Sequence, residues 1–102
     1  MKKLSLTKVT SSNIAAIGYL SLKMAMYVRF KSGELYEYEK VPKLVYRDFL
    51  NAESKGFYLR DHVRDRYHFR KLDELPDDPH ATSILFSAEY SLASVGTHGA
   101  WF

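Results

Sequence analysis

Residues 24 to 41 contain two alternating runs separated by a short break, and this pattern limits the fold more than any other feature of the chain. Met24, Met26, Val28 and Phe30 occupy every second position of the first run, which places their side chains on one face of a β-strand. Ser32-Gly33 interrupts the alternation before the second run begins. We therefore predict a β-hairpin whose two strands share one apolar face.

The length of the hairpin loop decides which side chains face each other. A two-residue loop would turn the acidic side chains of the second strand toward the apolar face of the first. A three-residue loop at residues 31–33 instead pairs Val28 with Tyr36. We predict this register, which leaves Glu37 on a solvent-exposed face and favours core packing of Tyr36 and Tyr38 over a role as a base-stacking platform.

The flanking segments supply one more strand and two helices. Residues 13–20 are apolar and partly β-branched, as is typical of a strand. Pro42 suits the first position of a helix, and apolar residues recur at helical spacing after it. Ser54 suits the N-cap of a second helix over residues 55–66, whose buried row is Leu59, Val63 and Tyr67. The predicted fold class is α+β: a three-stranded antiparallel meander followed by two packed helices, plus a C-terminal extension.

Composition places the chain among small globular proteins. Its 102 residues are 46% hydrophobic and 15% aromatic, which is enough for one modest core, and they include no cysteine. The sequence has neither the apolar run of a signal peptide nor the run of about 18 apolar residues that a membrane span requires. We therefore expect a cytoplasmic protein that does not associate with membranes.

Charge is distributed unevenly along the chain. All 15 Lys and Arg fall within residues 1–72, where seven acidic residues leave a net charge of +8, while residues 73–102 have five acidic residues and a net charge of −5. We predict a domain at residues 1–72 and an acidic, aromatic extension at residues 73–102. A basic body of this kind is typical of proteins that bind polyanions.

The segment from Ser54 to Lys71 combines the most positive charge with aromatic rings, and we predict that it binds RNA or another nucleic acid. An ordinary solvated helix face is the alternative interpretation. Cationic side chains neutralise phosphates and rings stack on bases. The expected phosphate-binding residues are Lys55, Arg60, Arg64, Arg66, Arg70 and Lys71, and the expected stacking residues are Tyr58 and Tyr67.

Catalytic motifs are absent from the sequence. It contains no glycine-rich phosphate loop, no nucleophile elbow and no paired metal-ligand motif. The histidines, His62, His68, His80 and His98, do not have the spacing of zinc ligands. We expect a non-catalytic binding module with no metal site and no cofactor.

A series of short motifs runs in order along residues 9–71: Ser11-Ser12-Asn13-Ile14, Ile17-Gly18-Tyr19, Phe30 with Gly33, Tyr36-Glu37-Tyr38, Val41-Pro42, Val45-Tyr46, Ala52 with Ser54-Lys55-Gly56 and Tyr58, Val63-Arg64, and Tyr67. Together they resemble the KTSC domain, a family named after the C-terminal domain of some lysyl-tRNA synthetases and also found as small stand-alone bacterial and phage proteins. The resemblance implies RNA binding. The chain departs from the family pattern at Leu59-Arg60, where Phe-Asn is expected, and the exchange adds a cation to the predicted surface.

The C-terminal extension supports a second hypothesis. Residues 73–79 have the composition of a linker, and residues 84–95 fit either a strand or a helix, of which we favour the helix. Trp101 and Phe102 are large rings that should dock on the body or on a partner. In this alternative the chain is a protein-interaction module, a phage or bacterial regulator of a partner enzyme or a homo-oligomer. The acidic extension is also expected to compete with nucleic acid for the basic segment.

Overall fold

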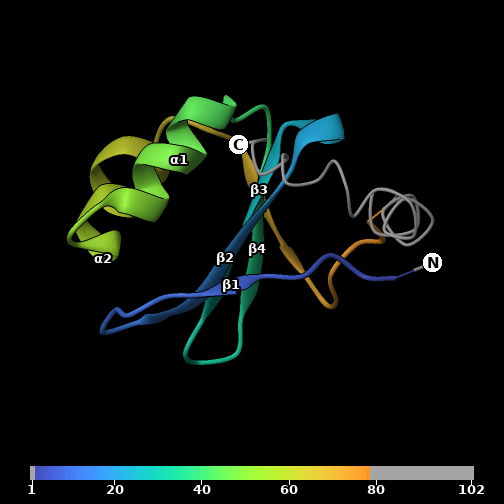
Figure 1. Cartoon of the computed structure of the whole chain (residues 1–102), viewed down its shortest axis with the longest axis horizontal. Helices are drawn as coiled ribbons and strands as arrows, with labels where there is room; N and C mark the ends of the chain where they lie inside the picture. Colours follow the sequence, from blue (N-terminus) through green and yellow to red (C-terminus); the bar gives the residue numbers. More distant parts are fainter. Residues whose placement is uncertain (1, 79–102) are drawn as a thin grey trace, which may run out of the picture. The chain divides into compact units, whose positions relative to one another are not determined.

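An antiparallel sheet of five strands, arranged in the order β1-β2-β3-β4-β5, organises the structure. This computed structural model describes residues 2–78. The helices lie on one side of the sheet (Figure 1). The strands are β1 (Thr7–Lys8), β2 (Ile14–Leu20), β3 (Ala25–Phe30), β4 (Leu35–Tyr38) and β5 (Phe69–Leu72), and the helices are α1 (Lys43–Asn51) and α2 (Lys55–Tyr58) with a 3-10 turn η1 (Ser21–Lys23) and a π-helical segment η2 (Leu59–Val63).

The α+β class is confirmed, but the predicted number of strands is wrong. The three predicted strands correspond to β2, β3 and β4, which form an antiparallel meander. Two short strands extend this meander into a larger sheet: β1 pairs with β2, and β5 returns after the helices to pair with β4. Their pairing with a neighbouring strand defines them, because each is too short to show a clear apolar alternation.

The hairpin between β3 and β4 has the predicted register. Val28 lies opposite Tyr36, and the N–H of Gly33 donates to the carbonyl of Phe30 at 2.9 Å. Gly33 has a φ of 104°, a conformation that side chains with a Cβ disfavour. The three-residue loop therefore depends on glycine at its last position.

Replacing Gly33 with alanine should lower the free energy of unfolding by about 1 to 2 kcal/mol, because a Cβ is strained at this positive φ. No neighbouring atom lies within 4 Å of the position that a Cβ would take, so the strain would come from the backbone alone. Urea denaturation of Gly33→Ala measures the effect, with Ser32→Ala in the same loop as the control. Equal stability of the two variants would contradict the prediction.

The first helix packs its apolar side on the sheet, as expected. It begins at Lys43, one residue later than predicted, with Pro42 as its N-cap. Phe49 is fully buried, and the ring of Tyr46 stacks on that of Tyr19 from β2 at a centroid distance of 5.2 Å. The hydroxyl of Tyr19 donates to the carbonyl of Val41 at 2.6 Å. These contacts fix α1 against β2.

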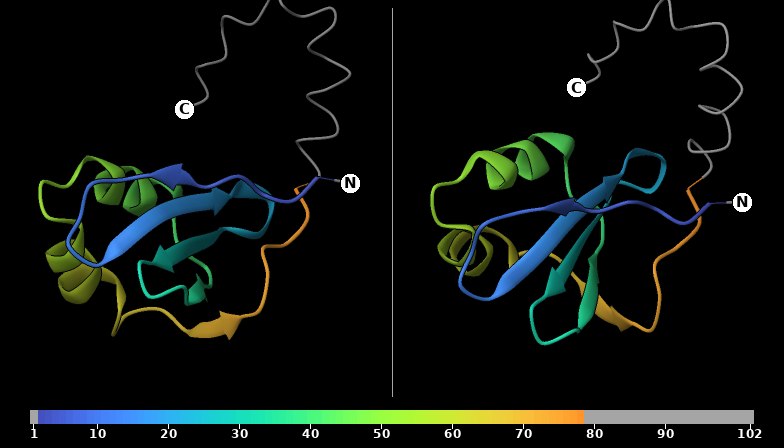
Figure 2. Two further views of the ribbon diagram at one scale, coloured as in Figure 1. Left: turned by 90° about the horizontal axis from the view of Figure 1, so that it is seen from below. Right: turned by 60° about the horizontal axis from the view of Figure 1, so that its bottom comes forward.

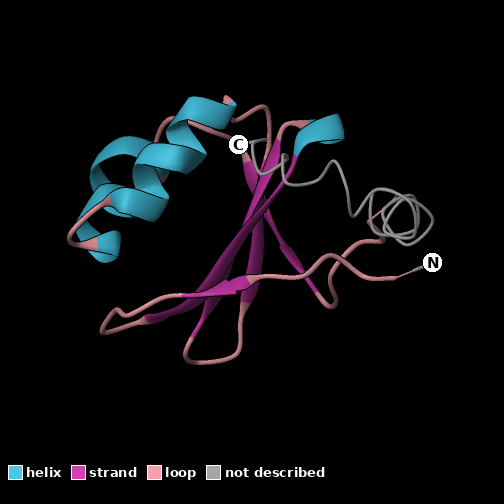
Figure 3. Ribbon diagram, in the orientation of Figure 1, coloured by secondary structure: helices cyan, strands magenta, loops and turns pink. Residues whose placement is uncertain are grey.

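The second helix begins as predicted but changes its geometry after one turn. The N–H of Phe57 donates to the Oγ of Ser54 at 3.3 Å, which confirms the N-cap. The helix then continues as the π-helical segment η2, so the regular helix predicted to run to residue 66 is shorter than expected. Leu59 and Val63 are buried, and Tyr67 is partly buried against the core. Figure 3 shows α1 and α2 on the same side of the sheet.

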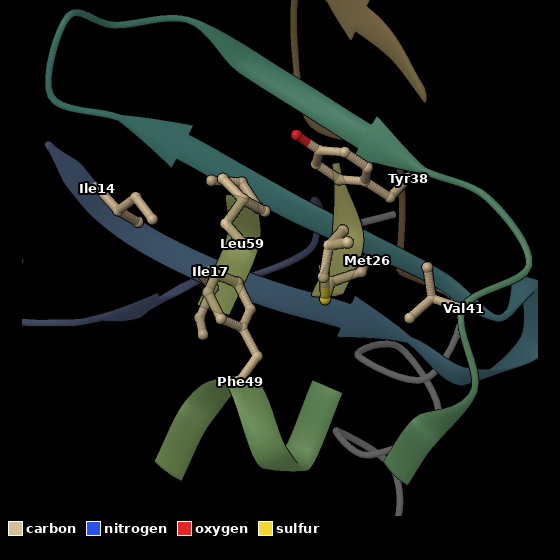
Figure 4. Close-up of a cluster of buried hydrophobic side chains, with 9 residues drawn as sticks. Ile14, Ile17, Met26, Tyr38, Val41, Phe49 and Leu59 are labelled. Atoms are coloured by element: carbon tan, nitrogen blue, oxygen red, sulfur yellow. The ribbon is translucent and has the colours of Figure 1, made fainter. Parts of the chain in front are cut away.

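The main core lies between this helical layer and one face of the sheet. Figure 4 shows Phe49 of α1 pointing toward Ile17 and Met26 of the sheet, with Leu59 and Tyr38 in the same cluster. Apolar burial of this kind is the largest favourable contribution to folding. The cluster comprises Ile14, Ile17, Met26, Val28, Tyr38, Val41, Phe49, Leu59 and Val63.

The opposite face of the sheet holds a buried carboxylate, so the prediction that Glu37 faces solvent is wrong. Glu37 is only 3% exposed. Its Oε2 accepts a hydrogen bond from the Tyr27 hydroxyl at 2.6 Å, and its Oε1 accepts one from Nε of Arg70 at 2.8 Å. The Nζ of Lys23 lies 3.5 Å from Oε2. We call these four residues the Glu37 cluster.

The strands that the sequence did not reveal help to explain this burial. In β5, Arg70 lies directly opposite Glu37. On the other side, Gly18 of β2 lies opposite Tyr27, and a Cβ on this glycine would come within 2.5 Å of Cδ2 of Leu6. The segment that leads into β1 therefore crosses this face of the sheet, and glycine leaves room for it.

Residues 5–75 form one compact unit, shown from two further directions in Figure 2. Residues 2–4 and 76–78 belong to a second unit. In that second unit Lys3 and Asp77 form an antiparallel bridge, and the N–H of Leu4 donates to the carbonyl of Pro76 at 2.9 Å. Part of the predicted linker is thus paired with the N-terminal segment. Among residues 2–78, no helix has the length and apolar character needed to span a membrane.

Candidate nucleic-acid interface

A cleft of about 580 Å³ is lined by α2 and η2 on one side and by residues of β3, β4 and β5 on the other. All of its described lining residues belong to the unit of residues 5–75. One end is formed by residues 10–13, which approach α2 closely: a Cβ on Gly56 would lie 3.4 Å from Oδ1 of Asn13. The cleft has the size typical of small-ligand sites.

Three aromatic rings from three strands form one wall of the cleft. Tyr36 and Phe69 are stacked, with centroids 5.4 Å apart and an interplanar angle of 9°. Phe30 meets Tyr36 edge-on at 5.6 Å. Phe69 is 50% exposed, while Phe30 and Tyr36 are partly buried. We call these three residues the aromatic wall; it presents ring surface to the cleft.

The opposite wall carries positive charge. Lys55, Arg60 and Arg64 line it, and Glu53 is the one acidic residue among the described lining residues. The guanidinium of Arg60 lies 4.7 Å from the centroid of the Phe57 ring, and its Nε is 3.1 Å from Oδ1 of Asp61. The Nζ of Lys55 donates to the carbonyl of Ala52 at 2.7 Å. These contacts orient the side chains and leave a net positive cleft.

The structure divides the cations that the sequence grouped together. Lys55, Arg60 and Arg64 line the cleft, and Arg66 lines a smaller depression that shares Arg64 and Phe69 with it. Arg70 lies on the opposite face in the Glu37 cluster, because neighbouring residues of a strand point to opposite faces. The Nζ of Lys71 is 3.6 Å from Oε2 of Glu34 on the surface.

The predicted stacking residues are also separated. Tyr58 is absent from the cleft lining, because its ring stacks on Phe49 at a centroid distance of 5.5 Å. Its hydroxyl donates to the carbonyl of Val45 at 3.3 Å, and burial is the main cause that raises the pKa of this hydroxyl. Tyr67 lines the smaller depression. Tyr38 is in the core as predicted, whereas its partner Tyr36 is partly exposed in the cleft.

Phe30 and Phe69 line the cleft but are not among the expected stacking residues, although Phe69 belongs to the predicted binding segment. Phe30 ends the alternating run, which predicts the face of the strand that its ring occupies but not what covers that face. The direction of the Phe69 side chain depends on the pairing of β5 with β4, which the local sequence does not predict. The remaining sites, Trp101, Phe102 and residues 84–95, lie outside the described residues. Between residues 2 and 78, no three His, Asp or Glu side chains come together as a metal site would require.

The fold and the cleft define a small α+β domain with an aromatic, basic surface cleft. The family model of the KTSC domain matches residues 10–67, more than half of the chain. The chain therefore belongs to the KTSC domain family.

Three similar proteins differ in how much of their own length the matched region covers. A lysine–tRNA ligase of Nostoc punctiforme is 34% identical over 67 residues, which are 66% of this chain but only 12% of the ligase. An uncharacterized protein of Stutzerimonas stutzeri is 32% identical over 74 residues, covering 72% of this chain and all of that protein. The crystal structure of a KTSC domain protein from Yersinia pestis superposes with a TM-score of 0.64 at 28% identity, over 68% of this chain and 97% of that one.

Proposed function

We propose that this chain is a non-catalytic module that binds single-stranded nucleic acid, RNA above all, in the cleft. One observation carries the proposal: the half-exposed Phe69 ring, stacked on Tyr36, lies in the same cleft as Arg60 and Arg64. Base stacking on an aromatic ring contributes about 1 to 3 kcal/mol per base. Arginine neutralises the phosphates that connect the bases. The two walls of the cleft thus match the two parts of a nucleotide.

Two further facts support this choice of ligand. The volume of about 580 Å³ accommodates a base with its sugar and phosphate. The cleft is open to solvent, which leaves room for the nucleic-acid strand to continue beyond it. The relative from Nostoc punctiforme is by its name a lysine–tRNA ligase, an enzyme that acts on an RNA. RNA is therefore the first ligand to test. We also propose that the protein acts in the cytoplasm.

The test is a fluorescence-anisotropy titration with a labelled single-stranded RNA of about 12 nucleotides. Three lining cations predict a salt slope of about −2, and so an affinity about 20-fold lower at 200 mM than at 50 mM salt. Single-stranded DNA of the same sequence and a double-stranded RNA serve as comparisons. Absence of binding to any of them at the lower salt concentration would overturn the proposal.

Replacing Arg64 with alanine should weaken RNA binding about fivefold, the equivalent of about 1 kcal/mol, because one phosphate contact is lost. The salt slope should become shallower by about 0.7. Arg47→Ala is the matched control, since Arg47 is exposed on α1 and absent from the cleft lining. If both variants lose affinity equally, net charge rather than the cleft controls binding.

A further inference from the structure

Tyr38 is a buried residue of the cleft whose hydroxyl lacks a hydrogen-bond partner among residues 2–78. The residue is only 2% exposed. Other tyrosines of the same unit differ: the hydroxyls of Tyr19, Tyr27 and Tyr58 donate to Val41, Glu37 and Val45, respectively. Native structures seldom leave a buried hydroxyl unpaired, so this one calls for a partner that residues 2–78 do not supply.

The surroundings of Tyr38 connect the hydroxyl with the cleft. In Figure 4 it points away from Val41 and toward the side of the cluster where Leu59 lies, and Leu59 also lines the cleft. The ring of Phe69 packs against the Tyr38 ring at 5.7 Å. The missing partner is therefore expected from the cleft side.

The Tyr38 hydroxyl is protonated and can therefore donate a hydrogen bond. Burial, with a smaller contribution from Tyr36, raises the pKa of Tyr38 to about 12, and Arg64 acts in the opposite direction. The group therefore stays protonated at neutral pH. Tyr36 and Arg64 both line the cleft, so the electrostatic influences on this hydroxyl come from that side as well.

We propose that the Tyr38 hydroxyl donates a hydrogen bond to the edge of one nucleobase whose face lies on the aromatic wall. The inference rests on the proposed function and adds base recognition to it. A neutral base edge suits this position better than a phosphate, because Leu59 and Phe69 make the surroundings apolar and a buried charge would be costly there. The exposed side chains of Arg60 and Arg64 bind the phosphates. Acceptors of the required kind are base carbonyl oxygens and unprotonated ring nitrogens.

The experiment compares the wild-type chain with Tyr38→Phe, which removes only the hydroxyl. The probes are labelled rU, rC and rA oligomers of about 12 nucleotides and an abasic ribose-phosphate oligomer of equal length. The wild type should bind at least one base-bearing oligomer more tightly than the abasic one. The variant should bind this preferred oligomer about fivefold to tenfold more weakly and the abasic one unchanged. Its melting temperature should rise, because an unpaired buried hydroxyl is gone.

Tyr19→Phe is the matched control, since the same atom is removed from a hydroxyl that already has a partner. It should melt at a lower temperature and bind every oligomer as the wild type does. If the wild type binds RNA and Tyr38→Phe binds it equally well, base recognition by Tyr38 is wrong while the proposed function stands. An equal loss of affinity for the abasic oligomer would assign the hydroxyl to the backbone and overturn the inference. No binding by the wild type would remove the function and the inference together.

Discussion

Replacing Glu37 with alanine should lower the free energy of unfolding by about 3 kcal/mol at neutral pH, because the Tyr27 hydroxyl would remain buried without its acceptor. Tyr27 is fully buried and donates to Glu37 at 2.6 Å. The substitution also removes the carboxylate that joins η1, β3, β4 and β5 through Lys23, Tyr27 and Arg70. Urea denaturation followed by circular dichroism measures the change.

Glu34→Ala is the control for this prediction. Glu34 belongs to the same hairpin, but its carboxylate is about half exposed and lies 3.6 Å from Lys71. A surface ion pair of this kind contributes about 0 to 1 kcal/mol, so the variant should be nearly as stable as the wild type. If Glu37→Ala leaves too little folded protein to measure, Glu37→Gln keeps an acceptor for Tyr27 and provides a milder version of the same test. Equal stability of the Glu34 and Glu37 variants would show that the buried cluster does not stabilise the fold.

The effect of Glu37 should depend on pH in one direction. Burial alone would raise the pKa of its carboxyl, but the hydrogen bonds from Tyr27 and Arg70 and the charge of Lys23 outweigh burial and hold the pKa below the ordinary value of 4.5. The stabilisation is therefore fully present above pH 4.5 and is lost as the pH falls through the lower folded-state value. The gap between the wild type and Glu37→Ala should narrow in acid; a gap that stays constant would contradict this account.

The hairpin shows which parts of the fold depend on local sequence. Its register follows from the alternation of apolar residues and the position of Gly33, and both are contained within a few residues of the chain. The N-cap at Ser54 and the buried pair Leu59 and Val63 are local in the same sense. Such features are predictable because neighbouring residues determine them.

The strand β5 shows where local patterns fail. Its sequence, Phe69 to Leu72, has two adjacent cations and resembles the rest of the basic segment that begins at Ser54. It becomes a strand because it pairs with the edge of β4, which lies about 30 residues earlier in the chain. The same pairing turns Arg70 toward Glu37 and Phe69 toward the cleft. This strand therefore places Arg70 beside Glu37 and adds the Phe69 ring to the aromatic wall.

The sequence predicts the cations of the candidate site but not its rings, again because the rings meet only through strand pairing. Lys55, Arg60 and Arg64 belong to one helical stretch, so sequence proximity alone grouped them near the cleft. The rings come from β3, β4 and β5 and meet only through the sheet. Tyr58 was a reasonable stacking candidate by spacing, but its ring lies against Phe49 instead. A site built from distant strands is visible only after the sheet is known.

Replacing Phe69 with alanine should weaken RNA binding by about 1 to 3 kcal/mol, roughly 5- to 150-fold, because the most exposed ring of the aromatic wall is lost. The salt slope should stay unchanged, since no charge is removed. This combination separates stacking from the effect of Arg64→Ala, which lowers both the affinity and the slope. Anisotropy titrations at several salt concentrations measure both quantities.

Two companion variants decide whether the ring itself matters. Phe69→Leu keeps apolar bulk without a ring and should bind almost as weakly as Phe69→Ala, whereas Phe69→Tyr keeps the ring and should bind nearly as the wild type does. Leu44→Ala controls for loss of an exposed apolar side chain, because Leu44 is 55% exposed on α1 and absent from the cleft lining. If Phe69→Leu binds RNA as tightly as the wild type, the contact is apolar packing and the bases do not stack on this wall. Arg60 and Arg64 would then bind the phosphates while the bases lie elsewhere.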